Sequence, residues 1–246
     1  MAPAIASALA LSVVLLALPA RASAETVDQI IARYLKARGG IERIHDVQTL
    51  RLTGKMTLPD VEAPLVLELK RPNRMRTEFV FQGKTGIRVF DGESAWMVLP
   101  VPGLDQPRPM SAEEARDARE QADIDLSPLV DAGAKGYAVE LVGQEAGLGG
   151  ESWKLRVRSR DGPVRTMYLD ARTYLVSRIE ETRTVEGKGE EFVTLISDYR
   201  STGGLVYPHS IEVGPKAGGE SQRFSFEKIE VNVPLDDSRF AMPASR

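Results

Sequence analysis

The chain has 246 residues and a formal net charge of −3, from 32 basic and 35 acidic side chains. This near-neutral balance lacks the basic stripe of a nucleic-acid-binding protein. The chain has no cysteine, which excludes a disulfide framework, a thiolate metal site and a lipid-modified N-terminal cysteine.

The first 24 residues have the pattern of a secretory signal peptide. The apolar run "AIASALALSVVLLAL" precedes Pro19, and the small residues Ala22 and Ala24 stand two apart before the expected cut. We expect cleavage after Ala24 and one exported domain over residues 25–246, most simply in a bacterial periplasm. An N-terminal membrane anchor is the alternative, although the run is shorter than the roughly 20 apolar residues of a spanning helix.

Two helical pieces are expected at the start of the mature chain. Thr26 and Gln29 form a capping box, and Gly39 and Gly40 end the helix that follows. A short piece around residues 41–44 comes next. The apolar positions of the first helix recur at helical spacing, and they are Val27, Ile30, Ile31, Tyr34 and Leu35.

A third helix is expected after the proline-rich segment "PVPGLDQPRP", which cannot join a sheet interior. Ser111 and Glu114 form a second capping box before a polar run. The apolar stripe of this helix is thin and consists mostly of Ala112, Ala115, Ala118 and Ala122. Such a helix packs lightly, so we expect a lid or an exposed cover.

The remaining apolar residues mostly recur with period two, which is typical of strands. The runs before the proline-rich segment are "QTLRLTGKMTL", "APLVLELK", "RMRTEFVFQ" and "GIRVFDGESAWMVL", with Asp91 and Gly92 in a tight turn. The runs after it are "YAVELVGQ", "SWKLRVRS", "VRTMYLD", "YLVSRIEETRTV", "EFVTLISDYR", "VYPHSIEVG" and "QRFSFEKIEVNV". We therefore expect a mainly β chain of the α+β class, with roughly eleven strands and two or three helices.

A sheet of this size has a large apolar face to bury. It must close into a barrel, fold on itself or be covered, because an exposed face of this kind would aggregate. The few helices would have to plug the concave side. An incompletely plugged concave face would form a hydrophobic binding cavity.

The sequence shows no catalytic constellation. Its two histidines, His45 and His209, are far apart and lack a metal-ligand pattern, and there is no G-x-S-x-G elbow. The glycine-rich runs "GQEAGLGGES" and "EGKGEE" lie between predicted strands, so we interpret them as hairpin loops and not as phosphate-binding loops. We expect no enzyme activity, no cofactor and no metal.

Several motifs, taken in order, resemble the bacterial outer-membrane lipoprotein carrier and lipoprotein-sorting proteins, the LolA/LolB-like family. They are "KRPN" at residues 70–73, the "DG" of Asp91 and Gly92 with Trp96 shortly after it, and F-x-x-P from Phe240 to Pro243. The resemblance spans the mature chain. The alanine-rich helix and the strand "GLVYPHSIEV" depart from the carriers and look like broader lipoprotein-sorting relatives.

The resemblance implies an unclosed antiparallel half-barrel of about eleven strands, with helices as a lid over a hydrophobic cavity. It implies a monomeric periplasmic carrier that binds acyl chains of lipoproteins or other lipids and transfers them toward the outer membrane. Its partners would include an inner-membrane donor and an outer-membrane acceptor. The alternatives are an envelope-stress sensor that binds a membrane regulator, and a hydrolase or isomerase that uses the cavity.

The strand pattern also predicts which side chains face the cavity, the alternative being that they are plain core. They are Leu50, Leu52, Met56, Leu65, Leu67, Leu69, Met75, Phe79, Phe81 and Trp96. Arg71 continues the apolar parity of Leu65, Leu67 and Leu69 at the end of its strand, where a long side chain can reach water. The resemblance implies instead that Arg71 is a gate that donates hydrogen bonds to lid carbonyls and holds the empty form closed.

Overall fold

The computed structural model describes residues 25–59, 61–147, 149–160, 162–185 and 188–243, so the expected signal peptide lies outside the described residues. The helices are α1 (Val27–Ala37), α2 (Ile41–His45), α3 (Ala112–Gln121) and the 3-10 turn η1 (Asp237–Arg239). The strands before α3 are β1 (Thr49–Leu58), β2 (Val61–Lys70), β3 (Arg74–Phe81), β4 (Lys84–Phe90), β5 (Ala95–Val98) and β6 (Arg108–Pro109). The strands after it are β7 (Tyr137–Gly147), β8 (Gly150–Ser159), β9 (Val164–Asp170), β10 (Val176–Val185), β11 (Lys188–Thr202), β12 (Leu205–Pro215) and β13 (Gln222–Val231).

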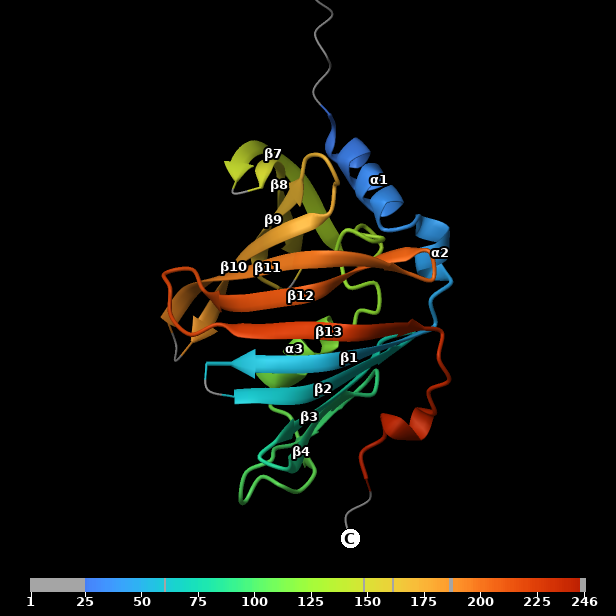
Figure 1. Cartoon of the computed structure of the whole chain (residues 1–246), viewed down its shortest axis with the longest axis vertical. Helices are drawn as coiled ribbons and strands as arrows, with labels where there is room; N and C mark the ends of the chain where they lie inside the picture. Colours follow the sequence, from blue (N-terminus) through green and yellow to red (C-terminus); the bar gives the residue numbers. More distant parts are fainter. Residues whose placement is uncertain (1–24, 60, 148, 161, 186–187, 244–246) are drawn as a thin grey trace, which may run out of the picture.

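The described strands form one antiparallel sheet that does not close. Their order is β6-β5-β4-β3-β2-β1-β13-β12-β11-β10-β9-β8-β7. The chain therefore enters at the centre of the sheet, proceeds outward to β6, crosses to the opposite edge and returns through β7 to pair β13 with β1. The crossing is made by residues 110–136, here called the crossover segment, which carry α3 behind β13 and β1 (Figure 1).

The helices and the crossover segment pack on one face of the sheet, which we call the inner face. Ile30 and Tyr34 of α1, Ile44 of α2 and Ala118 of α3 are all buried in the same apolar cluster. The helices α1 and α3 start where the sequence predicts, because the Thr26–Gln29 and Ser111–Glu114 capping boxes both form. The small alanine side chains let α3 approach the sheet closely, and Ala118 is fully buried. The face of α3 toward the sheet is therefore packed more tightly than the sequence suggested.

The expected half-barrel architecture is confirmed, with thirteen strands in the described residues where about eleven were expected. The strand that lies outside every predicted run is the two-residue β6, which lies at the sheet edge because its proline-rich context cannot join an interior position. The glycine-rich runs are hairpin connections. Gly147 pairs with Gly150, and Val185 pairs with Lys188, while residues 148 and 186–187 of these runs lie outside the described residues.

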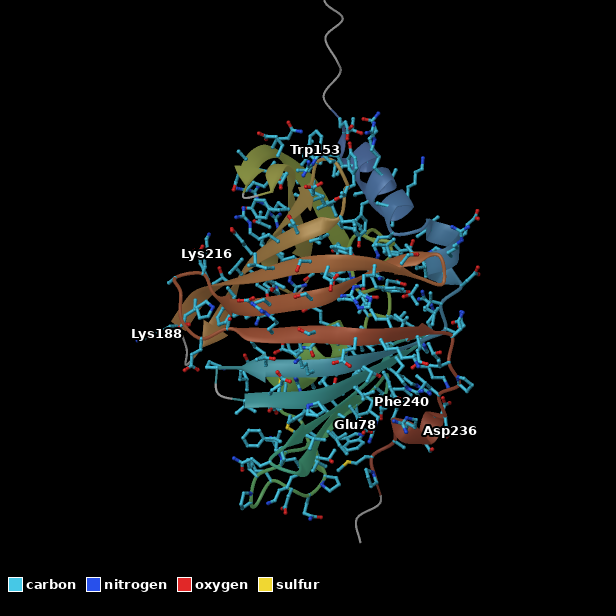
Figure 2. All side chains as sticks on the ribbon, in the orientation of Figure 1. Glu78, Trp153, Lys188, Lys216, Asp236 and Phe240 are labelled. Carbon is cyan, nitrogen blue, oxygen red and sulfur yellow. The ribbon has the colours of Figure 1, made fainter. Side chains whose placement is uncertain are left out.

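A smaller apolar cluster covers the opposite, outer face of the sheet. The C-terminal strap, residues 232–243, leaves β13 and follows the outside of the first strands, where Figure 2 shows Asp236 and Phe240 near Glu78 of β3. Phe240 packs with Leu235, Val89 and Trp96. This strap gives the N-terminal half of the sheet a second, separate core.

Candidate functional site

The inner face of β1, β2 and β3 carries a continuous patch of apolar side chains. The predicted residues that share this face are Leu50, Leu52, Met56, Leu65, Leu67, Leu69, Met75, Phe79 and Phe81. Leu50 is paired with Leu69 between β1 and β2, and Leu65 with Phe79 between β2 and β3. Directly opposed side chains on one face contact each other, so these residues act as one surface.

The patch is deeply covered near the helices and less so toward the hairpin ends of its strands. Leu50 and Leu69 are 0% exposed, beneath the helices. Met56, Phe79 and Phe81 are only half-buried. Phe79 lies over Gly86 of β4. A Cβ atom at position 86 would come within 2.2 Å of the ring, so only glycine leaves room for Phe79 here.

Trp96 does not belong to this patch, and its prediction as a cavity residue is wrong. Its neighbours Ala95 and Met97 join the inner cluster, while Trp96 points to the outer face and packs on Phe240. The indole Nε1 donates a hydrogen bond to the carbonyl of Phe240 at 3.1 Å. The tryptophan that follows the "DG" turn therefore contacts the phenylalanine of the F-x-x-P motif.

The strands on the other side of β1 extend the patch. Phe224 of β13 lies opposite Met56 on β1 and Ile211 on β12, and Ile211 lies opposite Ile196 on β11. Our sequence interpretation missed these three residues as site candidates. Their period-two pattern was visible, but only the pairing of β13 with β1 shows that they face the same side.

The space over the patch is filled by the crossover segment. Ala122, Ile124, Leu129 and Val130 are buried in the inner cluster. Two depressions of the described surface lie elsewhere, and none of the predicted cavity residues lines them. One of about 730 Å³ lies beside Thr49 and the start of the C-terminal strap, and one of about 510 Å³ surrounds Ser197, Ser210 and His209.

Arg71 ties the end of β2 to the elements that cover the inner face. Its Nε donates to the carbonyl of Val47 at 2.7 Å, and Nη2 donates to the carbonyl of Ile44 at 3.1 Å. Nη2 also lies 2.6 Å from Oδ1 of Asp125 in the crossover segment. A guanidinium group has five donors, so one side chain holds α2, the start of β1 and the crossover segment together.

Two further cations hold the same part of the crossover segment. Lys135 Nζ lies 2.7 Å from Asp125 Oδ2 and 2.8 Å from Asp123. The buried Arg38, at the end of α1, donates to the Asp125 carbonyl at 3.3 Å and to the Val206 carbonyl at 2.8 Å. We call Arg38, Arg71, Asp123, Asp125 and Lys135 the latch cluster.

The two carboxylates of the latch cluster differ in pKa. Burial alone would raise the pKa of Asp125, but hydrogen bonds and charge from Lys135 and Arg71 hold it below its ordinary value. Burial raises the pKa of Asp123, which lacks a contact from Arg71, even though Lys135 opposes this rise. The cluster therefore favours the ionised form of Asp125 more strongly than that of Asp123.

The histidines do not form a common site. His45 Nε2 lies 2.7 Å from Asp131 Oδ2, and His209 Nδ1 lies 2.6 Å from the Phe226 carbonyl. Within the described ranges, no group of three or more His, Cys, Asp or Glu side chains is placed to hold a metal ion. No helix in the described part of the chain is long and apolar enough to cross a membrane.

An open antiparallel sheet with one apolar face beneath helices defines the protein as a β half-barrel. Solved structures with this fold include a LolA superfamily protein from Nitrosomonas europaea, with a TM-score of 0.61 and 14% identity over 89% of this chain and 98% of that one. A domain described as outer membrane lipoprotein-sorting, from Vibrio parahaemolyticus, has a TM-score of 0.58 and 14% identity over 86% and 94%. A DUF1329 family protein from Desulfovibrio piger has a TM-score of 0.60 and 12% identity over 88% and 98%.

These likenesses confirm the LolA-like resemblance at the level of the fold. No family model and no curated protein matches the sequence. The cargo, the partners and the roles of individual residues therefore rest on the chemistry of the site.

Proposed function

We propose that the protein is a periplasmic carrier that binds acyl chains of lipoproteins or other lipids non-covalently and transfers them toward the outer membrane. The observation that carries this proposal is the continuous apolar inner face of β11, β12, β13, β1, β2 and β3, covered by a segment that polar contacts hold at its end. The LolA-like fold supports it. In this proposal the protein is not an enzyme and uses no cofactor.

An exchange with lipid requires the crossover segment to leave the inner face. Ala118 and Ala122 of this segment bury little apolar surface each, whereas Ile124, Leu129 and Val130 bury more. An acyl chain gains roughly 0.8 kcal/mol for each CH₂ group that it buries, so a chain of about 14 CH₂ groups gains about 11 kcal/mol. This gain offsets the burial that Ile124, Leu129 and Val130 lose when the segment moves, roughly 1.5 to 3 kcal/mol for each side chain, and contributes toward opening the latch cluster.

The test is lipid binding by two neighbouring variants of β3. Delipidated protein is titrated with a fluorescent fatty acid, and Phe79→Asn is compared with Val80→Asn. Phe79 is half-buried on the inner face, whereas Val80 is 38% exposed on the outer face. We expect binding by wild type and Val80→Asn and a loss of about tenfold in Phe79→Asn, since a polar group is introduced where an acyl chain packs.

The absence of binding in wild type, or equal affinity of the two variants, would contradict the carrier. Native mass spectrometry of protein purified from a periplasm gives a second measurement, with co-purifying lipid or lipoprotein as the expected result. A pull-down that recovers one stoichiometric membrane regulator independently of acylation would favour the envelope-stress sensor instead. The same preparation tests export, since the mature chain is expected to begin at Glu25.

A further inference from the structure

The inner face carries a charged side chain at a position where the carrier needs none. Arg165 of β9 shares this face with Met167 and lies opposite Val157 of β8 and Glu181 of β10. Met167 and Val157 are each 1% exposed, and the Arg165 side chain is 19% exposed. Arginine in such surroundings loses water and has to be compensated by charged partners.

The partners of Arg165 come from two different parts of the fold. Nε lies 2.5 Å from Oε2 of Glu181 on the neighbouring strand, and Nη1 pairs with Glu120 at the end of α3. Burial opposes the charge of Arg165, but the two carboxylates raise its pKa, so it remains a cation. Glu181 is shared, because Arg183 Nη2 also lies 2.6 Å from its Oε1.

Among the described residues, Glu120 forms its ion pair with Arg165 and with no other cation, whereas Glu181 is shared with Arg183. Lipid binding by the carrier would also separate Glu120 from Arg165. An acyl chain can occupy the inner face only if the crossover segment moves, and Glu120 moves with α3. Arg165 and Arg183 would then share the single carboxylate of Glu181, and incomplete compensation of a buried charge is unfavourable.

We propose, on the basis of the carrier function above, that the cargo is a lipid with an anionic group, a phosphate or a carboxylate, that binds Arg165 in place of Glu120. The planar guanidinium group suits both anions, because each offers two oxygens to its parallel N–H donors. Opening of α3 is then coupled to the charge of the cargo. A neutral lipid gains the apolar contacts but leaves Arg165 without its second partner.

The experiment compares lipids that differ in charge and share their acyl chains. Delipidated protein is titrated with a fluorescent fatty acid and its methyl ester, and separately with phosphatidic acid and the corresponding diacylglycerol. Wild type is expected to bind at least one anionic member about tenfold or more tightly than its neutral partner, because a charge-assisted hydrogen bond is gained. The arm that shows the difference identifies the carboxylate or the phosphate as the preferred group.

Arg165→Met should reduce the preference to within about twofold, while the matched control Arg156→Met should keep it. Arg156 is an arginine of the adjacent β8 that also pairs with a carboxylate, Glu140 at 3.1 Å, but its side chain is 43% exposed. Glu120→Gln serves if Arg165→Met does not fold. It keeps the cation, weakens the closed form, and should bind the anionic lipid more tightly than wild type does.

Equal affinity of wild type for both members of both pairs would overturn the inference and leave the carrier intact. A preference that persists in Arg165→Met, or unchanged or weaker anionic binding by Glu120→Gln, would overturn it as well. Failure to bind any of the four lipids would instead reject the carrier, and the inference with it.

Discussion

Arg71 Nη2 lies 2.6 Å from Asp125 Oδ1, which joins the end of a central strand to the segment that crosses the inner face. This pair explains why a charge continues the apolar row of Leu65, Leu67 and Leu69. The Arg71 side chain is 26% exposed and the Asp125 side chain 3%, so the arginine reaches a buried carboxylate rather than water. The acceptors include the carbonyl of Ile44 in α2 and that of Val47 between α2 and β1, which is the type of contact that the resemblance implied for a gate.

Arg71→Leu is expected to destabilise the ligand-free protein by about 3 kcal/mol, because Asp125 keeps its burial and loses one of its two cations. The urea midpoint of unfolding measures this change. The same substitution should slow the release of bound lipid. In the proposed gate, Arg71 stabilises the closed form and not the open one, so its loss shifts the equilibrium toward the open, occupied form.

Arg74→Leu is the matched control for that variant. Arg74 belongs to the same "KRPN"-strand junction but pairs with Asp237, whose side chain is 65% exposed. A surface pair of this kind contributes little, so we expect the stability and the release rate of wild type. If Arg71→Leu releases bound lipid at the wild-type rate, Arg71 has a purely structural role and is not a gate.

Acid should weaken the latch cluster. The pKa of Asp125 in the folded chain lies below its value in the unfolded chain, so its ionised form stabilises the fold above the unfolded pKa of about 3.9. This contribution is lost as the pH falls through the folded value. Asp125→Asn should therefore be less stable than wild type at pH 7, and the difference should shrink toward pH 2, as measured by urea unfolding across this range. A difference that is constant with pH would contradict the assignment of Asp125 as an ionised anchor.

The C-terminal strap should matter for stability and not for lipid affinity. Phe240 is 1% exposed and packs on Trp96 outside the sheet, so Phe240→Ala is expected to cost about 3 to 4 kcal/mol. Met242 is 43% exposed in the same strap, and Met242→Ala should leave the thermal midpoint almost unchanged. Fatty-acid affinity of folded Phe240→Ala should equal that of wild type. A marked loss of affinity would show that the outer cluster communicates with the inner face.

Local signals predicted the starts of the helices and the inner row of three strands. The capping boxes at Thr26 and Ser111 each involve residues three apart, and the alternation of Leu50, Leu52, Leu65, Leu67 and Leu69 depends on the geometry of a single strand. Such interactions span a few residues, so the sequence contains them completely.

Trp96 shows where local information ends. Alternation separates Trp96 from Ala95 and Met97, but it does not say which of the two sets faces the helices. The C-terminal strap decides this, because Phe240 arrives from a position 144 residues away and accepts the indole hydrogen bond. A buried tryptophan beside a hairpin was therefore assigned to the wrong face.

The amino-acid sequence by itself determined the helix ends, the strands and the apolar face of β1, β2 and β3, since each depends on neighbours in the chain. Only the tertiary structure decided that Phe224 and Ile211 extend this face, that Arg71 binds Asp125, and that Arg165 binds Glu120. These partners lie 54 and 45 residues apart. Their meeting depends on a chain that starts in the middle of its sheet and crosses the inner face once, which is a property of strand order and not of any local pattern.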